Sequence, residues 1–289
     1  MQSESTEPRG PTKMLGDDRK PDHPAARQIL GILAQGNYES ASGARVRIAQ
    51  EQSAAEEGTV LYSPERLAGL SMPSRESDPA VVEVRAATTQ EASFELAREG
   101  DVCALNFASA RNPGGGFFGG ARAQEEELCR CSGLYRTLLH AEDYYLANRA
   151  EKSLLYTDHV IYSPRVPFFR VWSQDHFLEA PFLVSVITAP APNAGAMARK
   201  RKNDSRHIEP TFDRRWEHVL AVAADQRQRR LVLGAWGCGA FLNEPEMVAR
   251  RARRALKRFR SAFDHVVFAI PTFTRRSEAN LKTFQRALG

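Results

Sequence analysis

The sequence predicts an α/β fold, a three-layer α/β/α sandwich with a mixed sheet, preceded by an N-terminal accessory layer that is mainly helical. Two observations lead to this prediction. Segments such as 101–109 and 182–190 are apolar on both sides, which is typical of strands that helices cover on both faces of a sheet. From residue 81 onwards, such segments alternate with segments of helical periodicity. With 289 residues, 42% of them apolar, the chain is long enough to bury this core.

The N-terminal part of the chain is expected to have two sections. Residues 1–24 are polar and contain four prolines, so we expect a mobile tail. Residues 25–80 are expected to form the accessory segment. In this segment a helix begins near Ala25 and stops at Gly36, strands occupy 43–50 and 59–63, and Ser63 caps a second helix that begins with Pro64. Residues 71–79 are predicted to form a loop.

The main unit is predicted to span residues 81–289. Strands are expected at 81–87, 101–109, 182–190, 231–236 and 265–271, with strand or extended pieces at 159–164 and 167–172. Helices are expected at 88–98, 124–140, 142–150, 210–228, 245–263 and from 277, with a polar, basic connection at 193–207. Two of these helices have N-terminal capping pairs in the sequence: Thr88 with Glu91, and Asn243 with Glu246.

Charge and composition narrow the choice of partner. The net charge is +5, which is the sum of −3 in residues 1–80 and +8 in residues 81–289. The positive charge of the main unit favours an anionic partner such as a nucleic acid or a phosphate-bearing ligand or polymer. The apolar stretches are shorter than the roughly 20 residues that span a bilayer, so we expect no membrane partner and a cytoplasmic protein. Four cysteines without CxxC spacing argue against a disulfide framework or a zinc site, and we expect neither metal nor cofactor.

Two glycine-rich loops follow predicted strands, at the edge of the sheet where open α/β folds bind ligands. The first, 106–127, contains five glycines that let backbone N–H groups approach a ligand: Gly114, Gly115, Gly116, Gly119 and Gly120. It does not match a dinucleotide-binding fingerprint, because four residues separate its first glycine from the strand. A flexible surface turn is the alternative interpretation.

The second loop, 234–245, lies between a strand and a helix. Gly237 and Gly239 free its backbone to point N–H groups at a diphosphate, and the following helix N-terminus adds a favourable dipole. No lysine follows Gly239, so this is not a Walker loop. Trp236 and Ala240 stand where a nucleophile elbow has glycines, so Cys238 is interpreted as a small loop residue.

The adjacent Glu125 and Glu126 are the candidates for acid–base chemistry. Adjacent glutamates usually form a solvated helix face, but these lie at a helix start near the end of a buried strand, where they point in different directions and can contact different parts of one ligand. A helix N-terminus favours the ionised carboxylate, whereas a general acid must hold its proton. Apolar walls from Phe117, Phe118 and Phe241, or a bound diphosphate, would have to raise the pKa.

These loops carry a family resemblance. Gly114–Gly116, seven residues and then Gln124-Glu125-Glu126 resemble the signature of poly(ADP-ribose) glycohydrolases, and NFASARNPGGGFFGGARAQEEELCRCSGLY is similar to their bacterial-type branch. The segment GAWGCGAF resembles the diphosphate loop of that branch. The resemblance spans about Val81 to the C-terminus and implies a macrodomain-like catalytic core at 81–289. It implies cleavage of the ribose–ribose O-glycosidic bonds of poly(ADP-ribose), from chain ends, to release ADP-ribose.

The resemblance also implies roles for individual residues. Glu126 would protonate the leaving 2′-oxygen and later deprotonate water, and Glu125 would hold ribose hydroxyls. Contacts to the rest of the substrate are implied as well. Gly114, Gly115 and Gly116 would contact the terminal ribose, Phe241 the distal ribose, and the diphosphate would be held by Gly237, Cys238, Gly239 and Ala240. Further candidate substrate contacts are Asn106, Ser109, Asn112 and Gln124. Ser109 stands where the animal-type enzymes have asparagine, which puts an amide contact to the ribose in doubt there. The implied partners are poly(ADP-ribose), ADP-ribose and ADP-ribosylated proteins, with no requirement for nucleic acid.

Three alternatives remain open. The first keeps the fold and releases single ADP-ribose units from proteins or nucleobases. The second is a non-catalytic ADP-ribose reader, for which both loops suffice and Glu126 is dispensable. The third is a nucleic-acid binder built on the basic run 250–260, which more often forms a solvated helix face.

Overall fold

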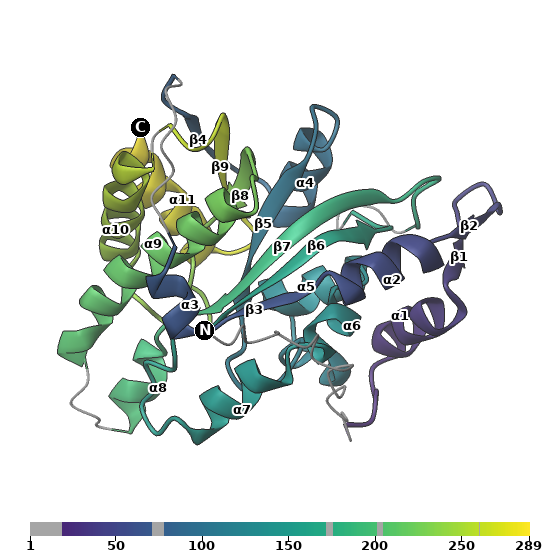
Figure 1. Cartoon of the computed structure of the whole chain (residues 1–289), viewed down its shortest axis with the longest axis horizontal. Coiled ribbons are helices and arrows are strands. Elements are labelled where there is room, and N and C mark those ends of the chain that lie inside the picture. The colour runs from purple at the N-terminus through teal and green to yellow at the C-terminus, as the bar shows by residue number, and fades with distance from the viewer. Residues whose placement is uncertain (1–18, 71–77, 172–175, 201–204, 260) are drawn as a thin grey trace, which may run out of the picture.

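A computed structural model describes residues 19–70, 78–171, 176–200, 205–259 and 261–289 (Figure 1). Residues 1–18 of the predicted tail and 71–77 of the predicted loop lie outside them. The core is a seven-stranded sheet in the order β3-β6-β7-β5-β8-β9-β4. Its strands are β3 (Val60–Tyr62), β4 (Val81–Arg85), β5 (Val102–Ala108), β6 (Val160–Phe168), β7 (Phe182–Pro190), β8 (Arg230–Leu233) and β9 (His265–Ala269). β3, β6 and β7 pair antiparallel and the remaining neighbours pair parallel, so the predicted mixed sheet is confirmed.

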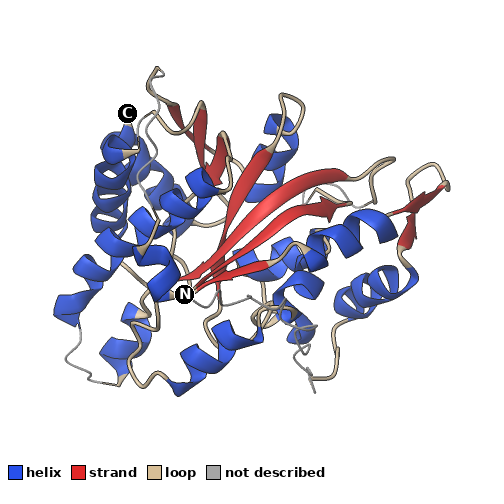
Figure 2. Ribbon diagram, in the orientation of Figure 1, coloured by secondary structure: helices blue, strands red, loops and turns tan. Residues whose placement is uncertain are grey.

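Helices cover both faces of this sheet (Figure 2). One face carries α1 (Pro24–Gln35), α2 (Ala49–Glu57), α4 (Thr89–Leu96), α5 (Gln124–Cys131), α6 (Leu134–Leu139) and α7 (Glu142–Ala150). The other carries α3 (Pro64–Ala68), α9 (Ile208–Asp225), α10 (Pro245–Arg258) and α11 (Arg275–Leu288). A separate hairpin of β1 (Asn37–Glu39) and β2 (Arg45–Arg47) follows α1. The three-layer sandwich is therefore as predicted, and β3 brings part of the segment 25–80 into the main sheet.

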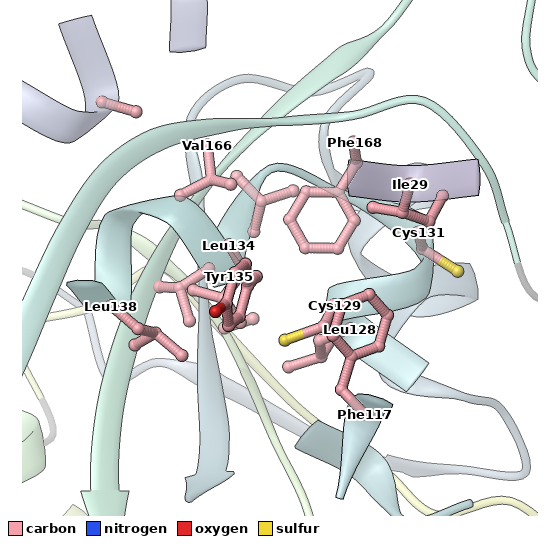
Figure 3. Packing of buried hydrophobic residues seen from close by; sticks show 14 of the residues in the cluster. Ile29, Phe117, Leu128, Cys129, Cys131, Leu134, Tyr135, Leu138, Val166 and Phe168 are labelled. Carbon is pink, nitrogen blue, oxygen red and sulfur yellow. The ribbon is translucent and has the colours of Figure 1, made fainter. Parts of the chain in front are cut away.

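Strand β5 shows why the central segments carry apolar residues on both faces. Val102 and Ala104 belong to the hydrophobic cluster on one face, and Cys103 and Leu105 to the cluster on the other. Successive side chains of a strand point to opposite faces, so a strand with helices on both sides needs apolar residues on both of its faces. Figure 3 shows part of the first cluster, in which Phe117 of the glycine-rich loop lies beside Leu128 and Cys129 of α5.

The helix ends follow the local sequence signals in most cases. Thr88 and Glu91 form the predicted capping box, Ser63 accepts a hydrogen bond from the N–H of Arg66 at 3.3 Å, and Gly36 ends α1 with φ 66°. The predicted cap of α10 by Asn243 and Glu246 is wrong. Glu244 caps this helix by accepting from the N–H groups of its second and third residues.

The predicted single helix 124–140 is interrupted between α5 and α6. At the break the Ser132 hydroxyl donates to the carbonyl of Leu128 at 2.7 Å, and the N–H of Gly133 donates to the carbonyl of Pro167 at 3.0 Å. Ser132 also forms an isolated bridge with Phe168. The chain leaves the helix because β6, which is distant in sequence, offers backbone partners at this point.

Several other boundaries differ from the prediction. The expected piece at 159–164 and the first two residues of the piece at 167–172 belong to the single strand β6, which ends at Phe168. The register of β6 shifts between Ser163 and Val166, and residue 172 is outside the described part. The expected connection 193–207 contains the short helix α8 (Ala194–Arg199), and its residues 201–204 are outside that part as well. α9 begins at Ile208 rather than Pro210, and α10 ends at Arg258. Within the described ranges, every helix is too short or too polar to cross a membrane.

Candidate active site

Both glycine-rich loops begin at the carboxyl ends of neighbouring parallel strands. β5 lies between β7 and β8 and runs parallel to both, so the loop from β5 to α5 and the loop from β8 to α10 leave the same edge of the sheet (Figure 1). The connection from β7 to α9 starts at that edge too. The two loops that the sequence singled out therefore lie together where α/β folds bind their ligands.

Gln124 joins the first turn of α5 to strand β5. Its Oε1 accepts from the N–H of Phe107 at 2.8 Å, and its Nε2 donates to the carbonyl of Leu105 at 2.7 Å and to Thr89 Oγ1 at 3.2 Å. β8 pairs with β5 only from Val102 to Ala104, so beyond that point the amide of Gln124 takes the place of a neighbouring strand. These contacts hold the start of α5, and hence the two glutamates, against the end of β5.

Glu125 is almost completely buried, with 2% of its surface exposed. Its Oε2 accepts from the N–H of Ser109 at 2.7 Å and its Oε1 from Nδ2 of Asn106 at 3.3 Å. Burial raises the pKa of Glu125 to about 8, and the negative charge of Glu126 adds to this, while the hydrogen bonds from Ser109 and Asn106 oppose it. A large fraction of Glu125 is therefore protonated at neutral pH.

Glu126 lies closer to solvent, with 8% of its surface exposed. Its Oε1 accepts from the N–H of Gly116 at 2.7 Å and its Oε2 from the N–H of Ala123 at 3.1 Å. Both oxygens are thus held by backbone amides of the glycine-rich loop, which restrict the carboxyl group to one orientation.

Gly115 is the position where the loop approaches both carboxyl groups. Its φ is 56°, a left-handed conformation that side chains disfavour. A Cβ there would lie 2.9 Å from Oε2 of Glu125 and closer still to Oε1 of Glu126. Only glycine, which has no Cβ, both adopts this φ readily and lets the backbone of the loop come this close to the two carboxyl groups.

The polar residues around β5 mainly support the loop and Glu125. Asn106 is fully buried, and its Nδ2 also donates to Thr188 Oγ1 of β7 at 3.2 Å, while its Oδ1 has no partner among the described residues. Ser109 Oγ accepts from the N–H groups of Arg111 and Asn112 at 3.3 and 3.1 Å, which forms the first turn of the loop. The side chain of Asn112 is exposed. The substrate contacts implied for Asn106, Ser109, Asn112 and Gln124 stay predictions.

The second loop presents unused backbone donors. The N–H groups of Gly237, Gly239, Ala240 and Phe241 donate to no residue in the described part of the chain. The N–H of Cys238 donates to the carbonyl of Ala235 at 3.0 Å, and burial raises the pKa of its thiol, which agrees with an inert loop residue. Asn243 fixes the loop by donating from Nδ2 to the carbonyls of Pro192 and Gly237 at 2.8 and 2.9 Å.

The expected contribution of the following helix N-terminus is not available. The Glu244 carboxylate already accepts from the first-turn N–H groups of α10, at 2.8 and 2.5 Å. An anion at this loop would therefore meet loop amides and a neighbouring carboxylate, not an open helix end.

Sequence reasoning missed several residues that shape this region. Tyr144 and Tyr145 of α7 are buried, their hydroxyls have no described partner, and burial and then the charge of Glu125 raise their pKa values. In the sequence they cannot be distinguished from ordinary core residues of an amphipathic helix. Arg19 donates to two carbonyls of the glycine-rich loop although it lies in the predicted tail.

Arg215 of α9 was missed as well. It is 1% exposed, pairs with Asp158 at 2.9 Å, and donates to the carbonyls of Pro190, Leu155, Tyr156 and Thr157. It thereby fixes the segment that places the ring of Tyr156 opposite that of Phe241, with centroids 6.3 Å apart.

The basic run 250–260 lies mostly on α10 and is partly neutralised. Arg251 and Arg254 pair with Asp213 at 3.2 and 3.8 Å, and Arg258 pairs with Glu217. Residue 260 is outside the described part. Among the residues described, no group of three or more potential ligands could hold a metal ion.

Comparisons with known proteins identify the family and the fold. The family model "microbial-type PARG, catalytic domain" matches residues 26–171, and no curated protein matches the chain. The structure is similar to that of poly(ADP-ribose) glycohydrolase (PARG) from Thermomonospora curvata, with a TM-score of 0.85 and 40% identity over 91% of this chain and 98% of that one. The same enzyme bound to the inhibitor ADP-HPD gives 0.82 and 40% over 91% and 97%. PARG from Deinococcus radiodurans in complex with ADP-ribose gives 0.78 and 46% over 84% and 98%.

Proposed function

The chain belongs to the microbial-type PARG family and is a poly(ADP-ribose) glycohydrolase, and we propose that Glu126 is its catalytic acid and base. The observation that supports this assignment is the arrangement of the two glutamates at the end of β5. Glu126 is the more exposed of the pair, and both of its oxygens are oriented by loop amides. Glu125 lies behind it, buried and hydrogen-bonded to the strand end.

The substrate is proposed to bind across both loops. The related enzyme from D. radiodurans is known in complex with ADP-ribose, and that ligand carries a ribose at each end of a diphosphate. The amides of Gly237, Gly239, Ala240 and Phe241 have no described acceptor and suit the diphosphate. The loop around Gly114, Gly115 and Gly116 would then enclose the terminal ribose, and Phe241 would pack on the distal ribose.

In the proposed reaction, the Glu126 carboxyl donates its proton to the 2′-oxygen as the bond from this oxygen to C1″ of the terminal ribose breaks. The carboxylate that remains stabilises the oxocarbenium-like state. It then accepts a proton from a water molecule whose oxygen bonds to C1″. Glu126 regains its proton, and the products are ADP-ribose and a polymer one unit shorter.

Glu125 is proposed to orient the terminal ribose. Its pKa of about 8 leaves it mostly neutral near pH 7, so it adds little negative charge beside Glu126 and the diphosphate. A neutral carboxyl also has an O–H group that donates a hydrogen bond to a ribose oxygen. The two glutamates thus have different roles because they differ in burial.

We further propose that cleavage proceeds from chain ends, that ADP-ribosylated proteins are partners, and that the protein acts in the cytoplasm. Support for end cleavage is the convergence of both loops on one edge of the sheet, which favours a closed site. Support for a reducing compartment is that all four cysteines are free and buried. An early product of free ADP-ribose, rather than of oligomers, is the result expected for end cleavage.

The assignment of Glu126 is tested with labelled polymer in the presence of EDTA. Wild-type protein should release ADP-ribose, and Glu126→Gln should release none while still binding ADP-ribose in a calorimetric titration. The matched control is Glu127→Gln, which changes the next carboxyl of the same helix, one that pairs with Arg130 at 2.9 Å. Equal release by wild type and Glu126→Gln would defeat the assignment. Release from mono-ADP-ribosylated thymidine but not from polymer would favour the alternative substrate class.

A further inference from the structure

The segment 19–23, called here the N-terminal strap, lies on the glycine-rich loop. The guanidinium of Arg19 donates from one nitrogen to the carbonyl of Gly115 at 2.6 Å and from another to the carbonyl of Pro113 at 2.5 Å. It also lies over the ring of Phe118, 4.8 Å from the centroid. A planar guanidinium suits two carbonyls that lie close together, because its donors form a rigid fork.

His23 fastens the other end of the strap. The backbone N–H of His23 donates to the carbonyl of Phe118 at 2.9 Å. The imidazole ring of His23 lies so close to Gly120 that a Cβ at position 120 would overlap the ring. Its Nδ1 accepts from the N–H of Ala25 at the start of α1, and Ile29 of that helix is buried in the core. The strap is therefore continuous with a packed helix, which limits how far the loop moves away from it.

The strap contacts the same peptide group that orients Glu126. The carbonyl of Gly115 and the N–H of Gly116 belong to one planar peptide unit. The carbonyl accepts from Arg19, and the N–H donates to Oε1 of Glu126 at 2.7 Å. A charged donor on the carbonyl polarises the peptide unit, so it strengthens the N–H as a donor as well as fixing the plane.

We propose that Arg19 is a positioning residue for Glu126, acting through the Gly115–Gly116 peptide. This inference rests on the proposed catalytic role of Glu126. The strap lies before residue 26, where the match to the family model begins. The positioning of the catalytic carboxyl thus depends on a segment outside that match.

The test compares Arg19→Ala, Arg19→Lys and the control Lys20→Ala in the full-length chain. Lys20 is the exposed neighbour of Arg19, so its replacement removes the same charge without touching the loop. For Arg19→Ala we expect kcat on polymer to fall about tenfold, because hydrogen bonds from charged groups are among the stronger ones. KM should change less than about threefold, since the second loop is intact. Arg19→Lys should recover part of kcat, because an ammonium reaches a carbonyl without the fork.

Hydrogen exchange provides a readout that does not depend on activity. Amides of residues 114–120 should exchange faster in Arg19→Ala than in wild type, while peptides from β7 and α9 keep their rates. Lys20→Ala should match wild type in both measurements. Unchanged kcat and unchanged loop exchange in Arg19→Ala would overturn the proposal. So would a loss of kcat that is matched by faster exchange throughout the protein, because that result indicates general unfolding.

The outcomes also separate this inference from the proposed function. If Glu126→Gln is inactive and Arg19→Ala behaves as wild type, only the positioning role fails. If Glu126→Gln remains as active as wild type, the catalytic assignment fails, and the positioning role fails with it whatever the exchange rates show.

Discussion

Replacing Gly115 with alanine tests how closely the loop must approach the two carboxyl groups. The left-handed φ of 56° costs an alanine about 1–2 kcal/mol relative to glycine. The new Cβ would also lie 2.9 Å from Oε2 of Glu125 and closer to Oε1 of Glu126, so the loop or the carboxyl groups must shift. Since a displacement of about 1 Å at a reacting group can reduce the rate about 100-fold, we expect kcat to fall by at least that factor.

The matched control is Gly119→Ala in the same loop. Gly119 is exposed, its φ is not positive, and a Cβ there would meet no atom within 4 Å. We expect this variant to keep the wild-type kcat and melting temperature, whereas Gly115→Ala should also melt about 2–4 °C lower per kcal/mol of strain. ADP-ribose release from polymer and differential scanning calorimetry measure the two quantities. A Gly115→Ala enzyme with a kcat within threefold of wild type would refute the steric reasoning.

Three further predictions concern the surrounding groups. Glu125 keeps its proton up to about pH 8 in the folded protein but only to its ordinary value of 4.5 when unfolded, so its contribution to stability is fully present below pH 4.5 and is lost as pH rises to 8, which lowers the melting temperature over that range. Glu125→Gln should flatten this decline, and a wild-type curve parallel to that of the variant would contradict it. Arg215→Leu should cost about 3–5 kcal/mol of unfolding free energy in urea, because it removes a buried guanidinium that pairs with Asp158 and donates to four backbone carbonyls. Arg214→Ala, at a half-exposed partner of Asp158, should cost about 1 kcal/mol or less, and equal costs would count against this account. Asn243→Ala removes two hydrogen bonds that fix the second loop, so the Kd for ADP-ribose in a calorimetric titration should rise about tenfold. An unchanged Kd would show that the second loop holds its shape without these hydrogen bonds.

Local patterns predicted the layers of the fold and several helix starts. The apolar residues on both faces of β5 require helices on both sides of the sheet, and the capping box of Thr88 and Glu91 is complete within four residues. The break at Ser132 is different, because it depends on partners in β6 that lie about 35 residues further along. The cap of α10 was assigned one residue too early, since the amide of Asn243 is used by Pro192 and Gly237.

The candidate site was predictable where its residues are contiguous in the chain. The two loops and the adjacent Glu125 and Glu126 have local signatures in the sequence, and the parallel strands bring the loops to one edge. Their supports come from distant positions. Arg19 meets Gly115 across 96 residues, and Asn106 meets Thr188 across 82, so neither contact has a local signal. The polar, proline-rich composition around Arg19 even favours a mobile tail.

The attachment of Gln124 to the edge of β5 has a consequence for where the loop can be altered in the laboratory. The start of α5 is tied to the strand itself, and the first half of the loop is tied to Arg19 and Glu126. Neither attachment involves Gly119, which faces open space. A reporter group attached at position 119 should therefore follow movements of the loop without displacing either carboxyl group.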